Sequence, residues 1–181
     1  VELMEGGGKI SPVETVLSGA ADFGVTGSDI LNNHIDKKPV VVVSVIFQHS
    51  PYVIVTMADK KISTPTDLAG KRIMASENQG WPLLRALFLK EGIPENKVNH
   101  IPHTWNNKDL ISGKVDALTG YVSMEPQLIQ QQGYKVSVIN PIDYGIDFYG
   151  DLIFTTSEMA NNNAETVEKF NQASIKGCRP R

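Results

Sequence analysis

The sequence is poor in cysteine and has no concentration of positive charge. Cys178 is the single cysteine among 181 residues, which excludes an internal disulfide and a multi-cysteine metal site. The 17 Lys and Arg residues are outnumbered by 20 Asp and Glu, and both signs are interspersed along the chain. A nucleic-acid-binding surface would need a basic patch. We therefore expect no nucleic-acid partner.

Long apolar runs are also missing. The longest surrounds residues 40–47 and is far shorter than the ~20 residues that cross a bilayer, so no membrane span is expected in this chain. A signal peptide is not recognisable at Val1. The 41% hydrophobic content nevertheless supports a core in one large domain or two small lobes.

Common catalytic and nucleotide-binding motifs are absent. The sequence contains no GxxxxGK[ST] or GxGxxG phosphate-binding pattern and no GxSxG nucleophile pattern. Its histidines show neither HxxxH nor HxH spacing, so a metal site is not expected. These histidines are His34, His49, His100 and His103.

Short strands and helices, separated by glycine and proline, fill most of the chain and predict an α/β fold. Strands are expected at residues 1–4, 21–26, 40–45, 52–57, 71–75, 98–101 and 152–156. The β-branched run at 40–45 is typical of a strand buried on both faces of a parallel sheet. Helices are expected after Ser11-Pro12, Ser28-Asp29, Thr64-Pro65, Trp81-Pro82 and Asn107. The glycines at 6–8 form either a plain turn or an anion-binding loop before the first helix.

An internal repeat is the most informative feature of the sequence. Residues 17–22 (LSGAAD) are matched by residues 111–116 (ISGKVD), and each copy leads through a short strand to Thr-Gly, at 26–27 and 119–120. Each copy predicts a helix ended by glycine, a tight turn and a buried strand. Two α/β lobes of like construction are therefore expected, with the strand ends facing a shared crevice.

Residues 140–156 (NPIDYGIDFYGDLIFTT) concentrate aromatic and acidic side chains just before a strand. Aromatic faces hold flat ligands and carboxylates orient amines, so the stretch suggests a binding wall. An ordinary turn with solvated acids is the alternative.

The segments EGG, LSGAADFGVTG, STPTDLAGKRI, SGKVDALTGY and YGIDFYGDLIFTT resemble the type II periplasmic solute-binding proteins. The most similar branch is that of thiamine-pyrimidine synthase and the pyrimidine-precursor-binding proteins, which also occurs in sensor domains. The resemblance implies a two-lobed α/β fold, with the family's first strand and helix missing here. It implies lobe one at residues 1–57 and 147–181, lobe two at 58–146, and hinge strands near 52–57 and 148–156 that close around a ligand.

Three residues are candidates for direct ligand contact. Trp105 lies in a polar loop, where it either stacks on a ligand or serves as a structural plug. The resemblance implies that the Glu125 carboxylate accepts hydrogen bonds from an amino group, the alternative being a solvated residue at a helix start. Tyr121 follows a glycine at a strand end and is expected to close over a ring.

A second candidate group precedes a helix. Ser76, Asn78, Gln79 and Gly80 offer hydroxyl, amide and backbone N–H groups to a phosphate, sulfonate or carboxylate, or else simply cap the helix. Further candidates, which depend on how the lobes are arranged, are Phe47, His49, Tyr144 and Asp151.

The expected function is to bind a small molecule in the periplasm, a thiamine-precursor-like pyrimidine or similar solute, for an ABC transporter or a fused membrane signalling module. The alternatives are a synthase-like enzyme and an interaction module without a ligand. The synthase relatives carry a cysteine-rich motif that this chain lacks, so neither catalysis nor a cofactor is expected.

Overall fold

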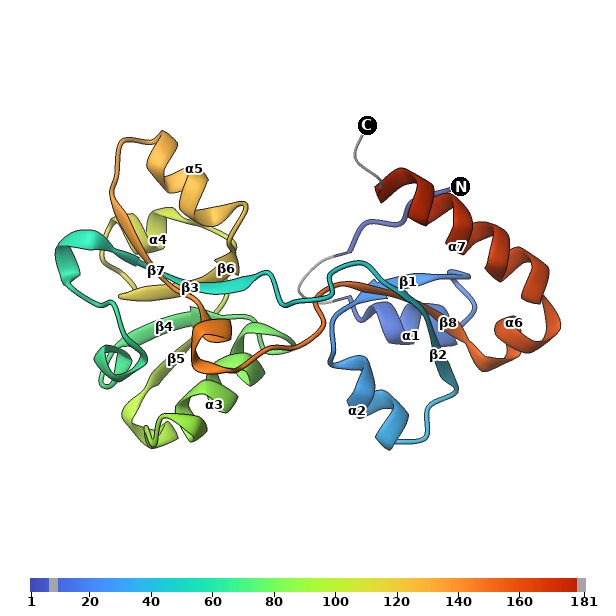
Figure 1. Cartoon of the computed structure of the whole chain (residues 1–181), viewed down its shortest axis with the longest axis horizontal. Helices are drawn as coiled ribbons and strands as arrows, with labels where there is room; N and C mark the ends of the chain where they lie inside the picture. The colour runs from blue at the N-terminus through green and yellow to red at the C-terminus, as the bar shows by residue number, and fades with distance from the viewer. Residues whose placement is uncertain (7–9, 179–181) are drawn as a thin grey trace. The chain divides into compact units, whose positions relative to one another are not determined.

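The computed structural model describes residues 1–6 and 10–178. The chain divides into two compact units: unit 1 comprises Val1–His49 and Phe148–Arg181, and unit 2 comprises Ser50–Asp147 (Figure 1). The glycines at positions 7 and 8, where an anion-binding loop was the alternative to a plain turn, lie outside the described residues. Within the described ranges, no helix is both long and apolar enough to span a membrane.

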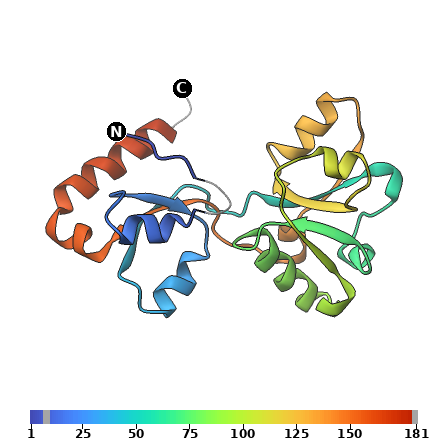
Figure 2. The same cartoon turned by 180° about the vertical axis from the view of Figure 1, so that it is seen from behind.

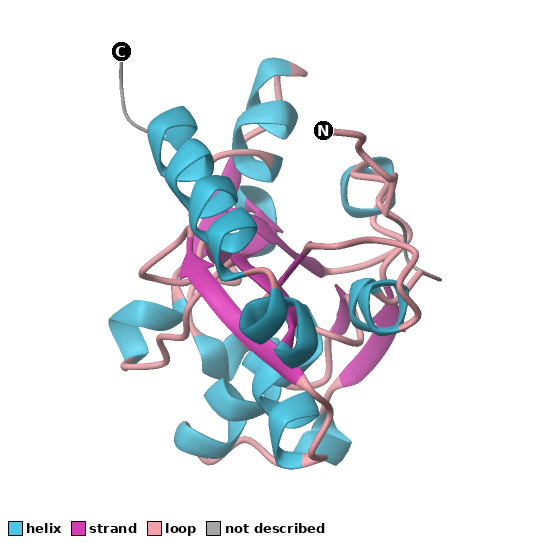
Figure 3. Cartoon of the chain, turned by 90° about the vertical axis from the view of Figure 1, so that its right-hand side faces the viewer, coloured by secondary structure: helices cyan, strands magenta, loops and turns pink. Residues whose placement is uncertain are grey.

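Unit 1 is built on a three-stranded antiparallel sheet in the order β1-β8-β2. Its strands are β1 (Gly24–Thr26), β2 (Val40–Val45) and β8 (Leu152–Thr156). Its helices, cyan in Figure 3, are α1 (Pro12–Leu17), α2 (Ile30–Ile35), α6 (Ser157–Asn162) and α7 (Ala164–Cys178). The core of the unit consists of Val13, Val16, Ile30, Val40, Leu152 and Phe154.

Two strand predictions in unit 1 are wrong. β2 is not buried on both faces of a parallel sheet: it runs antiparallel to β8 at one edge of the three strands, and Val41 and Val42 are 38% and 41% exposed. Residues that favour strands indicate that a segment can pack on a pleated sheet, but they do not indicate how many strands lie beside it. Residues 1–4 form no strand, because a strand requires a hydrogen-bonding partner and no described strand pairs with them.

Unit 2 contains a five-stranded mixed sheet in the order β5-β4-β6-β3-β7. β4 runs parallel to β5 and β6, whereas β3 runs antiparallel to β6 and β7. The strands are β3 (Tyr52–Met57), β4 (Arg72–Ala75), β5 (Asn99–Pro102), β6 (Ala117–Tyr121) and β7 (Val136–Ile139). The helices are α3 (Gly80–Lys90), α4 (Lys108–Ile111), α5 (Glu125–Gln131) and the 3-10 segments η1 (Ala58–Lys60), η2 (Pro65–Leu68), η3 (Glu95–Lys97) and η4 (Pro141–Tyr144).

Different helices cover the two faces of this sheet (Figures 1 and 2). Side chains alternate between the faces of a strand, so Ile54 of β3 packs in one cluster while its neighbours Val53 and Val55 pack in the other. The Ile54 cluster includes Leu84, Leu87 and Phe88 of α3. The Val53 cluster includes Leu110 of α4 and Ile129 of α5. β6, in the centre, is thereby fixed between two packed cores.

The boundary between the units differs from the expected one. We expected lobe one to continue to residue 57, but β3 lies wholly in unit 2 because it pairs with both β6 and β7. β8 lies wholly in unit 1, where it pairs with β1 and β2. The chain therefore passes from one unit to the other at residues 49–50 and 147–148. The hinge role of residues 52–57 and 148–156 stays a prediction.

The repeated SGxxD segments have the expected local structure in each unit. α1 and α4 are followed by Gly19 and Gly113 with φ of +77° and +74°, a conformation that glycine adopts at little cost. Each glycine N–H donates to a carbonyl of the preceding helix, that of Val16 and that of Leu110. The helix ends are confirmed; the shared crevice inferred from them stays a prediction.

Candidate functional site

The carboxyl end of β6 brings several candidate residues together within unit 2. Thr119 and Gly120 are buried there and Tyr121 is half-buried. Hydrogen bonds and close packing join this strand end to the Trp105 loop, to the start of α5 and to the start of α3. We call the residues His103, Trp105, Thr119, Tyr121 and Glu125 the β6-end cluster.

Glu125, the first residue of α5, is held against the strand end. Its Oε2 accepts the backbone N–H of Tyr121 at 2.6 Å. The carboxylate lies so close to Gly120 that a Cβ on that residue would come within 2.5 Å of Oε2. Glycine at position 120 is therefore what admits the carboxylate to the strand end. A carboxylate has about four acceptor directions, so Glu125 retains the capacity to accept further hydrogen bonds.

Trp105 is presented to solvent by an unusual backbone. Its φ is +59°, a left-handed conformation that is rare for a bulky residue, and its side chain is 65% exposed. The Trp105 N–H donates to Nδ1 of His103 at 2.9 Å, and the two rings lie 4.3 Å apart with a tilt of 34°. An exposed, fixed indole is a surface on which a flat ligand can stack.

His103 links this loop to β6. Its Nε2 lies 3.0 Å from the carbonyl oxygen of Thr119. Since a carbonyl can only accept, Nε2 carries the ring proton and Nδ1 is free to accept from Trp105. Burial lowers the pKa of His103, while its bond to the Thr119 carbonyl and the charge of Glu125 act in the opposite direction.

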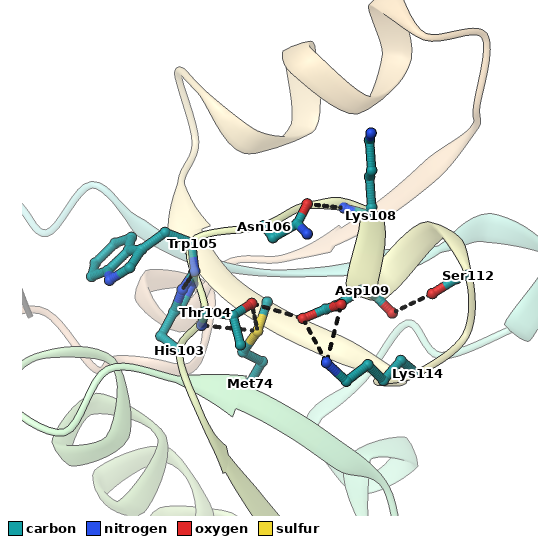
Figure 4. Close-up of polar contacts among 9 residues, drawn as sticks. All are labelled: Met74, His103, Thr104, Trp105, Asn106, Lys108, Asp109, Ser112 and Lys114. Carbon is teal, nitrogen blue, oxygen red and sulfur yellow. Dashed lines mark hydrogen bonds and ion pairs between the residues drawn. The ribbon is translucent and has the colours of Figure 1, made fainter.

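Thr104, which lies between His103 and Trp105 in the loop, is anchored on the side away from the indole (Figure 4). Thr104 Oγ1 donates to Asp109 Oδ2 at 2.7 Å and lies 3.3 Å from the sulfur of Met74. Lys114 Nζ also donates to Asp109, at 3.3 Å. The Thr104 hydrogen bond, supported by Lys114, holds the pKa of Asp109 below its usual range. Trp105 therefore projects from a loop whose base is tied to buried residues.

The candidate residues before α3 are used chiefly by the helix itself. The Gly80 N–H donates to Ser76 Oγ at 3.0 Å, and the Trp81 N–H donates to the Ser76 carbonyl at 2.8 Å. Two N–H groups at the start of α3 are thus bonded within the preceding turn, and Gln79 at the N-cap makes no side-chain cap hydrogen bond. The role of Ser76, Asn78 and Gly80 in binding an anion stays a prediction. Asn78 is exposed.

Gly80 also packs directly on Thr119. A Cβ at Gly80 would lie 2.4 Å from Thr119 Oγ1. That hydroxyl is buried and makes no hydrogen bond with the described residues. A buried hydroxyl without a hydrogen-bond partner is uncommon in proteins, and this one lies where α3 contacts β6.

An aromatic pair borders the cluster. The rings of Tyr52 and Tyr121 are 4.8 Å apart and nearly perpendicular, an edge-to-face contact. The Tyr52 hydroxyl donates to Gln79 Oε1. Gln79 at the start of α3 is thereby connected through Tyr52 to Tyr121 at the end of β6.

The remaining candidates are Tyr144 in unit 2 and three residues of unit 1. Tyr144, in η4, packs against the apolar core beside α3. Phe47, His49 and Asp151 belong to unit 1, where the Asp151 carbonyl accepts the Phe47 N–H at 3.2 Å. Within unit 2 the structure brings Trp105, Tyr121 and Glu125 together, whereas Tyr144 packs beside α3. The ligand role of Phe47, His49 and Asp151 stays a prediction.

Sequence reasoning missed His103 and Thr119 as members of the β6-end cluster and Tyr52 as its neighbour. His103 was considered only as a possible metal ligand, and among the described residues no group of histidine, cysteine and acidic side chains could hold a metal ion. The one available signal was the Thr-Gly at the end of the repeated strand, which marked the strand end but not the hydroxyl. The arrangement offers stacking surfaces and one carboxylate, a combination typical of a site for a flat ligand that carries hydrogen-bond donors.

Similar proteins bind small molecules. The chain is 23% identical over 171 residues to the formylaminopyrimidine-binding protein of Halalkalibacterium halodurans, and the match covers 92% of this chain and 52% of that protein. The chain thus spans about half the length of this curated relative.

Solved structures of binding proteins have a similar fold. The alkanesulfonate-binding protein of Xanthomonas axonopodis pv. citri, bound to MOPS, matches with a TM-score of 0.68 and 20% identity over 87% of this chain and 55% of that one. A substrate-binding protein of an ABC uptake transporter from Streptococcus pneumoniae, with bound histidine, matches with a TM-score of 0.65 and 19% identity over 91% and 65%. The expected α/β periplasmic-binding-protein fold is confirmed.

The family is shown by the match of a family model to nearly the whole chain. The NMT1/THI5-like model matches residues 1–179. Together with the fold, this match confirms the resemblance that the repeated SGxxD segments first suggested. The chain belongs to the NMT1/THI5-like family.

Proposed function

We propose that this chain binds an aromatic, amino-substituted small molecule, of which a formylaminopyrimidine is the model. The observation that carries the proposal is the exposed indole of Trp105, fixed next to a strand end that also holds Glu125 and Tyr121. The ring would stack on Trp105, and its amino group would donate to Glu125. The pyrimidine named for the Halalkalibacterium relative supports this ligand class.

The physical chemistry of the two side chains suits that ligand. An indole offers a large flat surface that loses little conformational freedom on binding, because only two torsions must be fixed. A carboxylate pairs with amino N–H donors, and hydrogen bonds to a charged group are stronger than neutral ones. Glu125 and Trp105 thus supply, respectively, orientation and contact area.

Ligand binding can be measured by thermal shift and by isothermal titration calorimetry. A ligand present at 100 times its Kd stabilises the folded chain by about 2.7 kcal/mol, which raises the melting temperature measurably. The panel would contain a formylaminopyrimidine, an aminopyrimidine, thiamine, MOPS, histidine and arginine. Stabilisation by the pyrimidines alone is the expected result, whereas stabilisation by MOPS alone would move the proposal to an anionic ligand at Ser76–Gly80.

Matched variants assign the contacts. Trp105→Ala and Glu125→Gln are each expected to weaken pyrimidine binding at least tenfold, since each removes a principal contact. Tyr134→Ala, which removes another exposed aromatic side chain, and Glu77→Gln, which neutralises another carboxylate, are the controls. Equal losses in the control variants would refute the assignment.

We further propose that the chain works outside the cytoplasm and delivers its ligand to an ABC permease, without catalysing a reaction. The names of the three similar proteins given above, which describe binding or transport, support this role. Expression of the complete gene followed by cell fractionation tests the location. Transport of labelled pyrimidine by cells with and without the gene tests the partner. A fused signalling module stays a prediction.

A further inference from the structure

We propose that His103 is a positioning residue for Trp105. The neutral imidazole accepts the backbone N–H of Trp105 on Nδ1 and so holds that backbone in its left-handed conformation, which places the indole for contact with a ligand. Protonation of Nδ1 would remove that acceptor and release the indole. This inference rests on the binding role proposed above, because it concerns how the stacking surface of the same site is held in place.

The hydrogen bonds on the two ring nitrogens fix the protonation state. Nε2 faces the Thr119 carbonyl at 3.0 Å and must donate to it. Nδ1 faces the Trp105 N–H at 2.9 Å and must accept from it. An imidazolium carries protons on both nitrogens, so Nδ1–H would point at another N–H donor and the bond to Trp105 would be lost.

The Trp105 backbone needs such a bond. Left-handed φ is unfavourable for a side chain that branches into a large ring, and a residue remains in it where surrounding contacts compensate. The flanking residues are fixed independently, Thr104 by Asp109 and Asn106 by the Lys108 N–H at 3.1 Å. Among the described residues, His103 Nδ1 is the acceptor that holds the backbone N–H of Trp105.

The surroundings of His103 indicate that the indole of Trp105 is released when the pH falls below neutral. Burial lowers the pKa of His103, and the neutral form therefore prevails at neutral pH. The charged side chain that acts on His103 is Glu125 at the start of α5, whose negative charge favours the imidazolium. A bound amino group that pairs with Glu125 would weaken this influence, so ligand binding and the neutral state of His103 are expected to favour each other.

The chain contains a matched histidine–tryptophan pair that serves as a control. His100 stacks on Trp81 at 4.3 Å, and its Nε2 lies 3.0 Å from the Ala75 carbonyl. Its Nδ1, however, faces Glu77 Oε1 at 3.6 Å and not a backbone N–H. Protonation of His100 therefore breaks no backbone hydrogen bond and is expected to leave Trp81 in place.

The first test needs no ligand. In the full chain carrying Trp81→Phe, fluorescence reports on Trp105 alone, since the chain has 2 tryptophans. Lowering the pH from about 8 to about 5 is expected to shift its emission as the Nδ1 hydrogen bond is lost and the indole is released from its fixed position. The Trp105→Phe chain, which reports on Trp81, is expected to show no such shift. Nitrogen-15 NMR at neutral pH is expected to show a proton on Nε2 of His103 and none on Nδ1.

Two substitutions separate positioning from packing. His103→Asn keeps an oxygen near the place of Nδ1, so it can still accept the Trp105 N–H but cannot titrate. His103→Phe keeps a ring and loses both nitrogens. The asparagine variant is expected to retain the neutral-pH emission of Trp105 and to abolish its pH dependence, while the phenylalanine variant is expected to show the acid-like emission at every pH. Far-UV circular dichroism verifies that each variant is folded.

Binding completes the test. Affinity of the wild-type chain for a formylaminopyrimidine is expected to fall about tenfold over the same pH range, and that of the His103→Asn variant to stay constant. A proton on Nδ1 at neutral pH, or identical fluorescence of the asparagine and phenylalanine variants, would overturn the positioning role. If no pyrimidine binds but the ligand-free results are as expected, His103 still positions Trp105 and the proposed ligand is wrong.

Discussion

The contact between α3 and β6 at Gly80 leads to a quantitative prediction. An ideal Cβ on Gly80 would lie 2.4 Å from Thr119 Oγ1 and 3.2 Å from Thr119 Cβ. The first distance is about 1 Å shorter than an ordinary contact, and Thr119 is 1% exposed on a central strand, where it has little room to move. Gly80→Ala is therefore expected to overpack this point.

The net cost follows from two opposing effects. Forcing an extra carbon into a packed core costs about 1–3 kcal/mol. Alanine favours a helix over glycine by up to about 1 kcal/mol in the interior and by less at the first helical residue. Gly80→Ala should thus lower the free energy of unfolding of unit 2 by about 1–2 kcal/mol.

The assay is urea unfolding followed by tryptophan fluorescence. Both tryptophans, Trp81 and Trp105, lie in unit 2, so the signal reports on that unit. With a slope of about 1–3 kcal/mol per molar urea, the expected loss shifts the midpoint downward by several tenths molar or more. The control is Gly177→Ala in α7, where an added Cβ meets no atom within 4 Å.

A double-mutant cycle identifies the cause. Thr119→Ala removes the hydroxyl that the new Cβ would meet, so Gly80→Ala in that background is expected to cost little. The expected interaction energy is about 1 kcal/mol or more. A neutral or stabilising Gly80→Ala, or a cycle with no interaction energy, would refute the packing argument.

Three further changes test the rest of unit 2. Leu84→Ala empties a fully buried position in the core and should cost about 2–5 kcal/mol in urea unfolding; a loss below 1 kcal/mol would contradict that core. Gly113→Ala forces alanine to φ +74° and should cost about 1 kcal/mol, whereas a stabilised variant would contradict the turn. The hydrogen bonds from Arg72 lower the pKa of Asp116. The stability that they contribute to the folded state is therefore present above the unfolded pKa of about 3.9 and is lost as the pH falls through the lower folded pKa. Asp116→Asn should flatten this acid dependence in thermal melts, and an unchanged profile would exclude the Asp116 pair.

Local signals in the sequence predicted most of the elements. The Ser11-Pro12 pair begins α1, and the Ser11 hydroxyl accepts the Glu14 N–H, as a capping serine should. The apolar spacing after Trp81 places Leu84, Leu87 and Phe88 in one cluster. The glycines of the two repeated segments end their helices as predicted, because the geometry of a helix end depends on only a few nearby backbone groups.

Predictions that depended on distant partners were less successful. The β-branched run of β2 gave no sign that its strand lies at an edge, because strand neighbours are chosen by pairing with β8, more than a hundred residues later. The unit boundary was misplaced for the same reason, since the pairing of β3 with β6 and β7 decides its unit. Tyr144 packs against the core beside α3, and its role as a ligand contact stays a prediction.

The sequence by itself determined the family, the α/β class, the repeated helix-end turns and the aromatic and acidic residues available for a ligand. The tertiary structure alone decided which of them meet. His103 bonds to the Thr119 carbonyl, Glu125 reaches the Tyr121 N–H, and Gly80 rests on Thr119 because β6 is paired between β3 and β4. Local propensity acts over a few residues, whereas these contacts depend on strand pairing and on the two packed cores that hold β6 in place.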